Sequence, residues 1–239
     1  MPDYLKRFNA LVKDLATYPY IEIMEYVTHP PVHLTDLKAV EAHLEAPLTE
    51  AIHSFYEQTN GLKLHWRIKR DLSLEETEKL RNKSSDFYVL IAEYVDDPFA
   101  NIHLLPIQDC IFKYKWEQLA TAHWEKTIEF KDTIYQREDF KKQLKPFDLI
   151  SSEYCMAYFF EKGNGNPSVL LLNEECSEWI NSRLTDFESY IEMLLATRGI
   201  VEAREKIFAT EHGDSEPPFI AGSDYWEKHY TPKIFEGSK

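Results

Sequence analysis

The sequence predicts an α+β fold: a single domain with a mostly antiparallel, twisted sheet flanked by helices, with an N-terminal helix and a C-terminal extension. Two observations support this prediction. Segments with apolar residues every three or four positions lie toward both ends of the chain, whereas alternating or continuous apolar segments fill the middle. The resulting order of helices, several strands and further helices favours an α+β arrangement over repeating βαβ units. The 239 residues fit one large domain, and a hydrophobic content of 44% is ample for a buried core.

Residues 1–34 are expected to form an N-terminal helix and a lead-in to the main domain. The helix is indicated by apolar residues at helical spacing, namely Leu5, Phe8, Leu11, Val12 and Leu15. Pro19 ends the helix, and Ile21 and Ile23 begin a short strand. Thr35 is then expected to cap a helix over 36–45.

Residues 47–68 contain the clearest change of period in the chain. An apolar stripe predicts a helix over 49–59, formed by Leu48, Ile52, Phe55, Tyr56 and Thr59. Asn60-Gly61 ends the helix, because Asn and Gly tolerate the left-handed backbone found at many helix C-termini. Alternation then predicts a strand with one buried face, carrying Leu62, Leu64, Trp66 and Ile68.

The middle of the chain is expected to supply most of the sheet. Residues 70–85 form a charged insertion, in which Ser73 and Glu76 make a capping box for a polar surface helix. Further strands are predicted at 87–95, 101–105, 110–114, 127–135 and 154–160. The last of these is expected to form a hairpin with 168–172, because the segment between them is rich in Gly, Asn and Pro.

The C-terminal part returns to helical spacing. Thr185 and Glu188 predict a second capping box for a helix over 186–198, and Gly199 is its stop. A further helix is expected over 201–210. Aromatic residues in the tail imply that it docks on the body of the protein: Trp226, Tyr230 and Phe235.

These motifs, taken in order, resemble the SUKH superfamily with its Smi/Knr-type fold. The resemblance is carried by Pro47 before the helix, Asn60-Gly61 before the strand, the segment 103–107, Phe147-Asp148 and the closing helix with Phe187 and Tyr190. It implies a SUKH-like domain over 35–199. The charged segment 70–85 is then an insertion, and residues 200–239 form a C-terminal helix and tail packed on that domain.

The charge of the chain bears on its partners and location. The net charge is −14, from 41 acidic and 27 basic residues, which disfavours direct binding of nucleic acid. It favours a basic protein partner, although the same charge also serves solubility alone. Three separated cysteines form no disulfide framework and suit a reducing compartment. Without a signal-peptide pattern or a long apolar run, we expect a cytoplasmic protein with no membrane association.

No residue pattern indicates a catalytic, cofactor-binding or metal site. His29 and His33 are four residues apart, but Pro30-Pro31 prevents one helical turn from presenting both to zinc. Cys155 lies in an apolar strand, where burial disfavours the thiolate. Cys110 and Cys176 each follow acidic residues, which has the same effect.

The candidate partner-binding residues are Glu174, Glu175, Glu178 and Trp179, an acidic stretch with an aromatic anchor. The alternative is a solvated face with a half-buried Trp. The SUKH resemblance implies a bacterial immunity protein that binds and neutralises a cognate toxin, often a nuclease. A regulatory or scaffold interaction protein is one alternative, and an enzyme with a carboxylate- or His-containing cleft is another.

Overall fold

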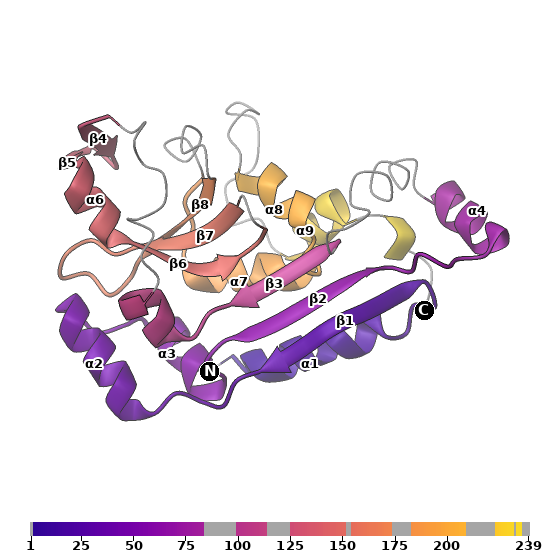
Figure 1. Cartoon of the computed structure of the whole chain (residues 1–239), viewed down its shortest axis with the longest axis horizontal. Helices are drawn as coiled ribbons and strands as arrows, with labels where there is room; N and C mark the ends of the chain where they lie inside the picture. Colours follow the sequence, from indigo (N-terminus) through magenta and orange to yellow (C-terminus); the bar gives the residue numbers. More distant parts are fainter. Residues whose placement is uncertain are drawn as a thin grey trace.

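A six-stranded antiparallel sheet with the order β1-β2-β3-β6-β7-β8 organises the chain in the computed structural model (Figure 1). The structure describes residues 2–83, 99–113, 125–151, 154–173, 183–208, 223–231 and 233–235. The strands are β1 (Ile21–Thr28), β2 (Leu62–Ile68), β3 (Ala100–Leu104), β6 (Leu144–Leu149), β7 (Tyr154–Phe159) and β8 (Ser168–Asn173). Every neighbouring pair is antiparallel, which confirms the predicted α+β class.

Helices cover one face of this sheet. Figure 1 shows α1 (Tyr4–Leu15) and α7 (Phe187–Ala196) behind the strands, and both contact α3 (Glu50–Gln58). Their apolar stripes meet the inward side chains of the strands in one large core. The remaining helices are α2 (Leu34–Leu44), α4 (Leu74–Lys83), α8 (Val201–Phe208) and α9 (Ser223–Tyr230).

The α3–β2 unit has the predicted form. Thr49 caps the helix, and β2 alternates strictly between buried and half-buried residues. Gly61 has a φ of +93°, and a Cβ there would lie 2.4 Å from the carbonyl oxygen of Leu104. The Asn60 side chain accepts a hydrogen bond from the Ile107 N–H and donates one to Gln108. Asn60-Gly61 therefore joins this turn to the one that follows β3.

A second, smaller unit packs on the other face of half the sheet. It consists of the hairpin β4 (Thr127–Phe130) and β5 (Thr133–Gln136), followed by α6 (Arg137–Gln143). Alternate residues of β7 serve two cores: Met156 and Tyr158 face the main core, whereas Ala157 and Phe159 face the small unit. The strands β6 to β8 are thus sandwiched between two apolar layers.

Two predicted strands are wrong. The segment 110–114 begins within a π-helical turn, Asp109–Lys113. The N–H groups of Asp109 and Cys110 both bond the Pro106 carbonyl, so the chain is already coiled in a helical turn where the strand was predicted to begin. The predicted strand 127–135 is instead a hairpin, since Lys131 and Asp132 have φ values of +50° and +59° and reverse the chain. The helix α6 after the hairpin was not predicted.

Two predicted helix caps are also wrong. Thr35 lies inside α2, whose N-cap position is His33. Thr185 pairs with Val169 of β8 in an isolated bridge, so Asp186 caps α7 by accepting from the Ser189 N–H. The Ser73–Glu76 capping box, in contrast, forms as predicted.

Other predictions concern the tail and segments outside the described residues. Trp226 and Phe235 are buried against the body, as expected of a docked tail. The predicted strand 87–95 and Cys176 lie outside the described residues. In the part of the chain that the structure describes, no helix is long and apolar enough to cross a bilayer.

Candidate functional site

The four residues proposed from the sequence as a partner-binding site are Glu174, Glu175, Glu178 and Trp179. All of them lie outside the described residues, between the end of β8 and the start of the described chain at Arg183. Their role stays a prediction, and the candidate sites below come from other parts of the fold.

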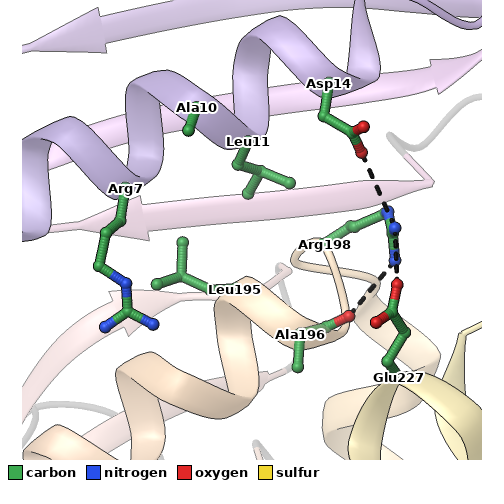
Figure 2. A pocket seen from close by; sticks show the side chains of 8 residues that line it. All are labelled: Arg7, Ala10, Leu11, Asp14, Leu195, Ala196, Arg198 and Glu227. Atoms are coloured by element: carbon green, nitrogen blue, oxygen red, sulfur yellow. Dashed lines mark hydrogen bonds and ion pairs between the residues drawn. The ribbon is translucent and has the colours of Figure 1, made fainter. Parts of the chain in front are cut away.

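An open groove of about 350 Å³ lies between α1 and α7 (Figure 2). Its apolar lining comes from both helices: Ala10 and Leu11 from α1, and Leu195 and Ala196 from α7. Two ion pairs show that the helices run in the same direction: Arg7 near the start of α1 pairs with Glu192 of α7, and Asp14 near the end of α1 pairs with Arg198, just after α7. Both helices therefore have their C-termini at the same end of the groove.

Arg198 occupies that end of the groove. Its guanidinium lies 2.9 Å from the Glu227 carboxylate of α9 and 3.8 Å from the Asp14 carboxylate of α1. Figure 2 shows the side chain pointing between these two acids. The guanidinium also lies 4.5 Å from the centre of the Phe235 ring, and the residue has a left-handed backbone with φ +56°. Arg198 thus joins α1, α7, α9 and the tail.

The opposite end of the groove is closed by a second arginine. Arg7 donates through both terminal nitrogens to the two carboxylate oxygens of Glu192, with one N–O distance of 2.6 Å. This two-bond geometry balances the charge of Arg7 against that of Glu192 and raises the pKa of Arg7. The two ends of the groove consequently differ in charge. At one end Arg7 pairs with the single acid Glu192, whereas at the other end Arg198 pairs with two acids, Asp14 and Glu227.

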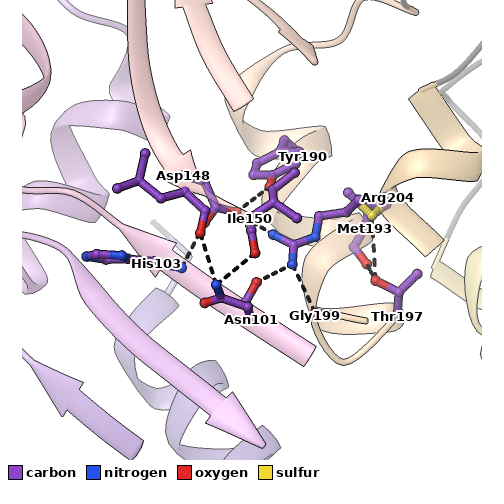
Figure 3. A network of polar contacts seen from close by, with 10 residues as sticks. Asn101, His103, Asp148, Ile150, Tyr190, Met193, Thr197, Gly199 and Arg204 are labelled. Carbon is purple, nitrogen blue, oxygen red and sulfur yellow. Dashed lines mark hydrogen bonds and ion pairs between the residues drawn. The ribbon is translucent and has the colours of Figure 1, made fainter. Parts of the chain in front are cut away.

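A buried polar network forms a second candidate site (Figure 3). Asp148 of β6 and Arg204 of α8 form an ion pair at 2.8 Å, and neither side chain has any exposed surface. The Tyr190 hydroxyl of α7 donates to the same carboxylate at 2.5 Å, and the backbone N–H of His103 donates to the other carboxylate oxygen. Burial and the adjacent Asp148 charge raise the pKa of Tyr190 well above its ordinary value.

This network is architectural. Arg204 also donates to the backbone oxygens of Asn101 and Gly199, so it bonds strand β3 and the turn after α7 at once. Burial is the largest single influence on Arg204 and opposes its charge, but the Asp148 carboxylate and Tyr190 together outweigh it, so the pKa of Arg204 is raised. With both charges buried, the groups hold α7 and α8 to the sheet and have no surface on which to meet a substrate.

A third cluster lies on the face of β1, β2 and β3 that points away from the helices. Glu25 and His65 approach within 3.4 Å, and Glu22 pairs with Arg67 at 2.7 Å. Burial lowers the pKa of His65 and of the neighbouring His103. A carboxylate–imidazole pair is chemically able to transfer a proton. The Nε2 atom of His65 is buried and has no hydrogen-bond partner, which keeps it away from solvent.

The thiols and the metal-binding residue types add no further site in the described part of the chain. Cys110 is buried beside Tyr56, and burial raises the pKa of its thiol. Cys155 is buried in β7, as predicted. Among the described residues, no three His, Cys, Asp or Glu side chains gather closely enough to hold a metal ion.

Sequence reasoning missed the groove because its charged residues come from α1, from the turn after α7 and from α9, which are far apart in the chain. Asp14, Arg198 and Glu227 have no shared local pattern. Asp148 did carry a signal, since an acid within an apolar strand needs a buried partner. Comparison of the sequence with known protein families and with curated proteins finds no match.

Proposed function

We propose that the chain is a non-catalytic protein-binding domain whose partner is a basic protein. Following the SUKH resemblance, that partner is a toxin, and the chain is a bacterial immunity protein that binds and neutralises it. The observation that carries the proposal is the net charge of −14 on a folded α+β domain. Such a charge attracts a basic partner and accelerates encounter with it.

The distribution of acidic residues supports this proposal. The segments outside the described residues contain two of the 27 basic residues, Lys115 and Lys239, but thirteen of the 41 acidic ones. These acids are Asp86, Glu93, Asp96, Asp97, Glu117, Glu153, Glu174, Glu175, Glu178, Glu211, Asp214, Glu216 and Glu236. Thirteen acids minus two bases give these segments a net charge of −11 out of the −14 of the whole chain, and the predicted contacts Glu174 and Glu175 are among their acids.

The state of the most perturbed groups also fits a non-catalytic role. Burial raises the pKa of Tyr56, Tyr158 and Tyr190 well above the ordinary value, and each ring is packed in the main core. Functional sites often perturb pKa values, but buried structural groups do so as well. Here Tyr56 donates to the Leu105 carbonyl and Tyr190 donates to Asp148, and burial is the main cause of each shift, so packing within the chain accounts for them.

The proposal is tested by purifying the tagged full chain from its native cells and identifying what accompanies it. We expect one stoichiometric basic protein, encoded beside this chain, that dissociates at high salt. Charge reversal of Glu174 and Glu175 to Lys should weaken that complex about tenfold or more, as expected for charges at an interface. The matched control reverses Glu57 and Asp139, two exposed acids on α3 and α6.

A growth assay completes the test. Expression of the chain should protect cells from the associated toxin, and the weakened variant should protect less. Several substoichiometric partners would contradict the immunity role and favour a regulatory scaffold. Failure to bind or to protect against a toxin encoded beside the chain would contradict the proposal itself.

One observation favours an enzyme as a second candidate, namely the Glu25–His65 pair on the outer sheet face. In that case the partly exposed Glu25 carboxylate accepts the proton, and the His65 imidazole positions that carboxylate. A His65→Asn variant should then lose turnover of a substrate while the folded state survives. Retention of protection against a toxin in this variant would favour the binding function.

A further inference from the structure

We propose that the groove between α1 and α7 is a docking site for one lysine or arginine side chain of a protein partner. The inference rests on the proposed function in so far as the partner is a basic protein. It goes further by naming the surface and the chemical group that enters it. Three features of the groove carry it: convergent helix C-termini, an excess of carboxylates at one end, and an apolar floor.

The helix dipoles make the Arg198 end of the groove electronegative. Helix α1 ends at Leu15 and α7 ends at Ala196, and the parallel packing brings both ends together. The carbonyl groups of a helix C-terminus carry a partial negative charge that favours cations. Asp14 lies in the last turn of α1, where a carboxylate is electrostatically unfavourable for the helix. An incoming cation would relieve this repulsion.

The side-chain charges at this end add to the same field. Two carboxylates, Asp14 and Glu227, share the single guanidinium of Arg198. Glu227 takes the short contact, whereas Asp14 keeps only an ion pair at 3.8 Å. Asp14 therefore retains acceptor capacity for another donor. Arg7 cannot balance the excess, since both of its terminal nitrogens bind Glu192.

The floor of the groove suits the stem of a long basic side chain. Ala10, Leu11 and Leu195 line it between the two charged ends. Lysine and arginine bury their methylene groups along apolar surface and keep the charged head in a polar environment. Figure 2 shows the apolar side chains lying between Arg7 on one side and the Asp14–Arg198–Glu227 cluster on the other. A basic side chain lying along the groove places its head beside Asp14.

The first experiment uses the wild-type full chain and a defined probe. N-acetyl-arginine amide is titrated into ¹⁵N-labelled protein, and backbone amide shifts are followed by NMR. We expect saturable shifts confined to residues around Asp14, Leu195 and Glu227. The isosteric but neutral citrulline derivative should produce none of them. Equal shifts with both compounds, or shifts elsewhere only, would overturn the inference.

Variants then test the carboxylates. The double variant Asp14→Asn/Glu227→Gln should bind the arginine probe at least tenfold more weakly, because it removes both acids at the electronegative end. The matched control Glu57→Gln/Asp139→Asn removes the same formal charge elsewhere and should bind like the wild type. An equal loss in both variants would mean a diffuse charge effect and would overturn the site. Binding of N-acetyl-aspartate at this end instead would overturn the cation assignment.

The same variants separate this inference from the proposed function. If the Asp14→Asn/Glu227→Gln variant protects cells from the toxin as well as the wild type, the groove is not the docking site, although the immunity role survives. If the wild type fails to protect cells, the immunity role is contradicted. The arginine titration still tests whether the groove binds a basic side chain. The titration of the wild type needs no variant, so a folding defect in the double variant cannot leave the inference undecided.

Discussion

The two halves of the central sheet share one helical layer but differ on the opposite face. Across β6, β7 and β8, the side chains on that face are apolar and covered by β4, β5 and α6. Across β1, β2 and β3, they are partly exposed and mainly polar, with Val27 as an apolar exception: Glu22, Glu25, Lys63, His65, Arg67, Asn101 and His103. One half thus gains stability from a second apolar layer, whereas the other relies on cross-strand charge pairs.

A set of polar contacts lies at the boundary between the apolar half and the polar half of the sheet. Asp148 lies on β6, next to β3, and its charge is neutralised by Arg204 rather than by solvent. The Asn101 side chain of β3 donates to the backbone oxygens of Leu149 and Ile150 just beyond it. A polar seam therefore separates the apolar sandwich from the charged face, and breaking it should affect both halves.

The largest effect is expected at this seam. Asp148→Ala leaves Arg204 charged and buried, which should lower the free energy of unfolding by about 3–5 kcal/mol. Chemical denaturation of both proteins measures the difference. Arg67→Met, which breaks the partly exposed Glu22 pair in the polar half, serves as control and should cost at most about 1 kcal/mol. Similar losses in the two variants would refute the distinction between seam and surface.

The apolar half should be sensitive to cavities. Phe140 of α6 is fully buried and packs its ring 4.7 Å from that of Phe159. Phe140→Ala should therefore destabilise the protein by about 3 kcal/mol, through lost burial and the cavity left behind. Hydrogen exchange should show faster opening of β4, β5 and α6 before that of β2. Uniform acceleration over the whole sheet would mean that the small unit does not unfold separately.

Two glycines at turns provide a sharper comparison of the halves. At Gly61, before β2, a Cβ would clash with the Leu104 oxygen and the φ is +93°, so Gly61→Ala should cost roughly 2–4 kcal/mol. At Gly163, in the β7–β8 hairpin, the φ is +74° but nothing lies within 4 Å. Gly163→Ala should then cost only about 1–2 kcal/mol. Thermal unfolding measures both, and a reversed order would exclude the close approach at Gly61.

The smallest effect concerns pH. Burial lowers the native pKa of His65 and His103, so the unfolded chain binds more protons than the native chain as pH falls. Their contribution to stability is complete above about pH 6.5, the unfolded value, and is lost as pH falls from there through the lowered native pKa. Urea midpoints between pH 8 and pH 5 should decline less steeply in a His65→Asn/His103→Asn variant. An equal or steeper decline would contradict the prediction.

The sequence alone determined the elements whose signals are local. The stripe in α1, the Thr49–Gly61 segment, the alternation of β2 and the β7–β8 hairpin each follow from residue spacing within about a dozen positions. The α+β class followed from their order. Errors occurred where one local pattern fits two structures. The segment 127–135 fits both a single strand and a hairpin, because the spacing of its apolar residues does not indicate where the chain reverses.

Tertiary structure alone decided the sites. Asp14, Arg198 and Glu227 meet only because α1 and α7 pack in parallel and α9 folds over their ends. Asp148 and Arg204 form their ion pair although 56 residues separate them in the chain. The outer face of the sheet is covered over β6 to β8 only because α6 and the β4–β5 hairpin pack there. Local spacing encodes which face of an element is apolar. It does not encode which distant charge will neutralise a buried one, since that depends on packing of the whole chain.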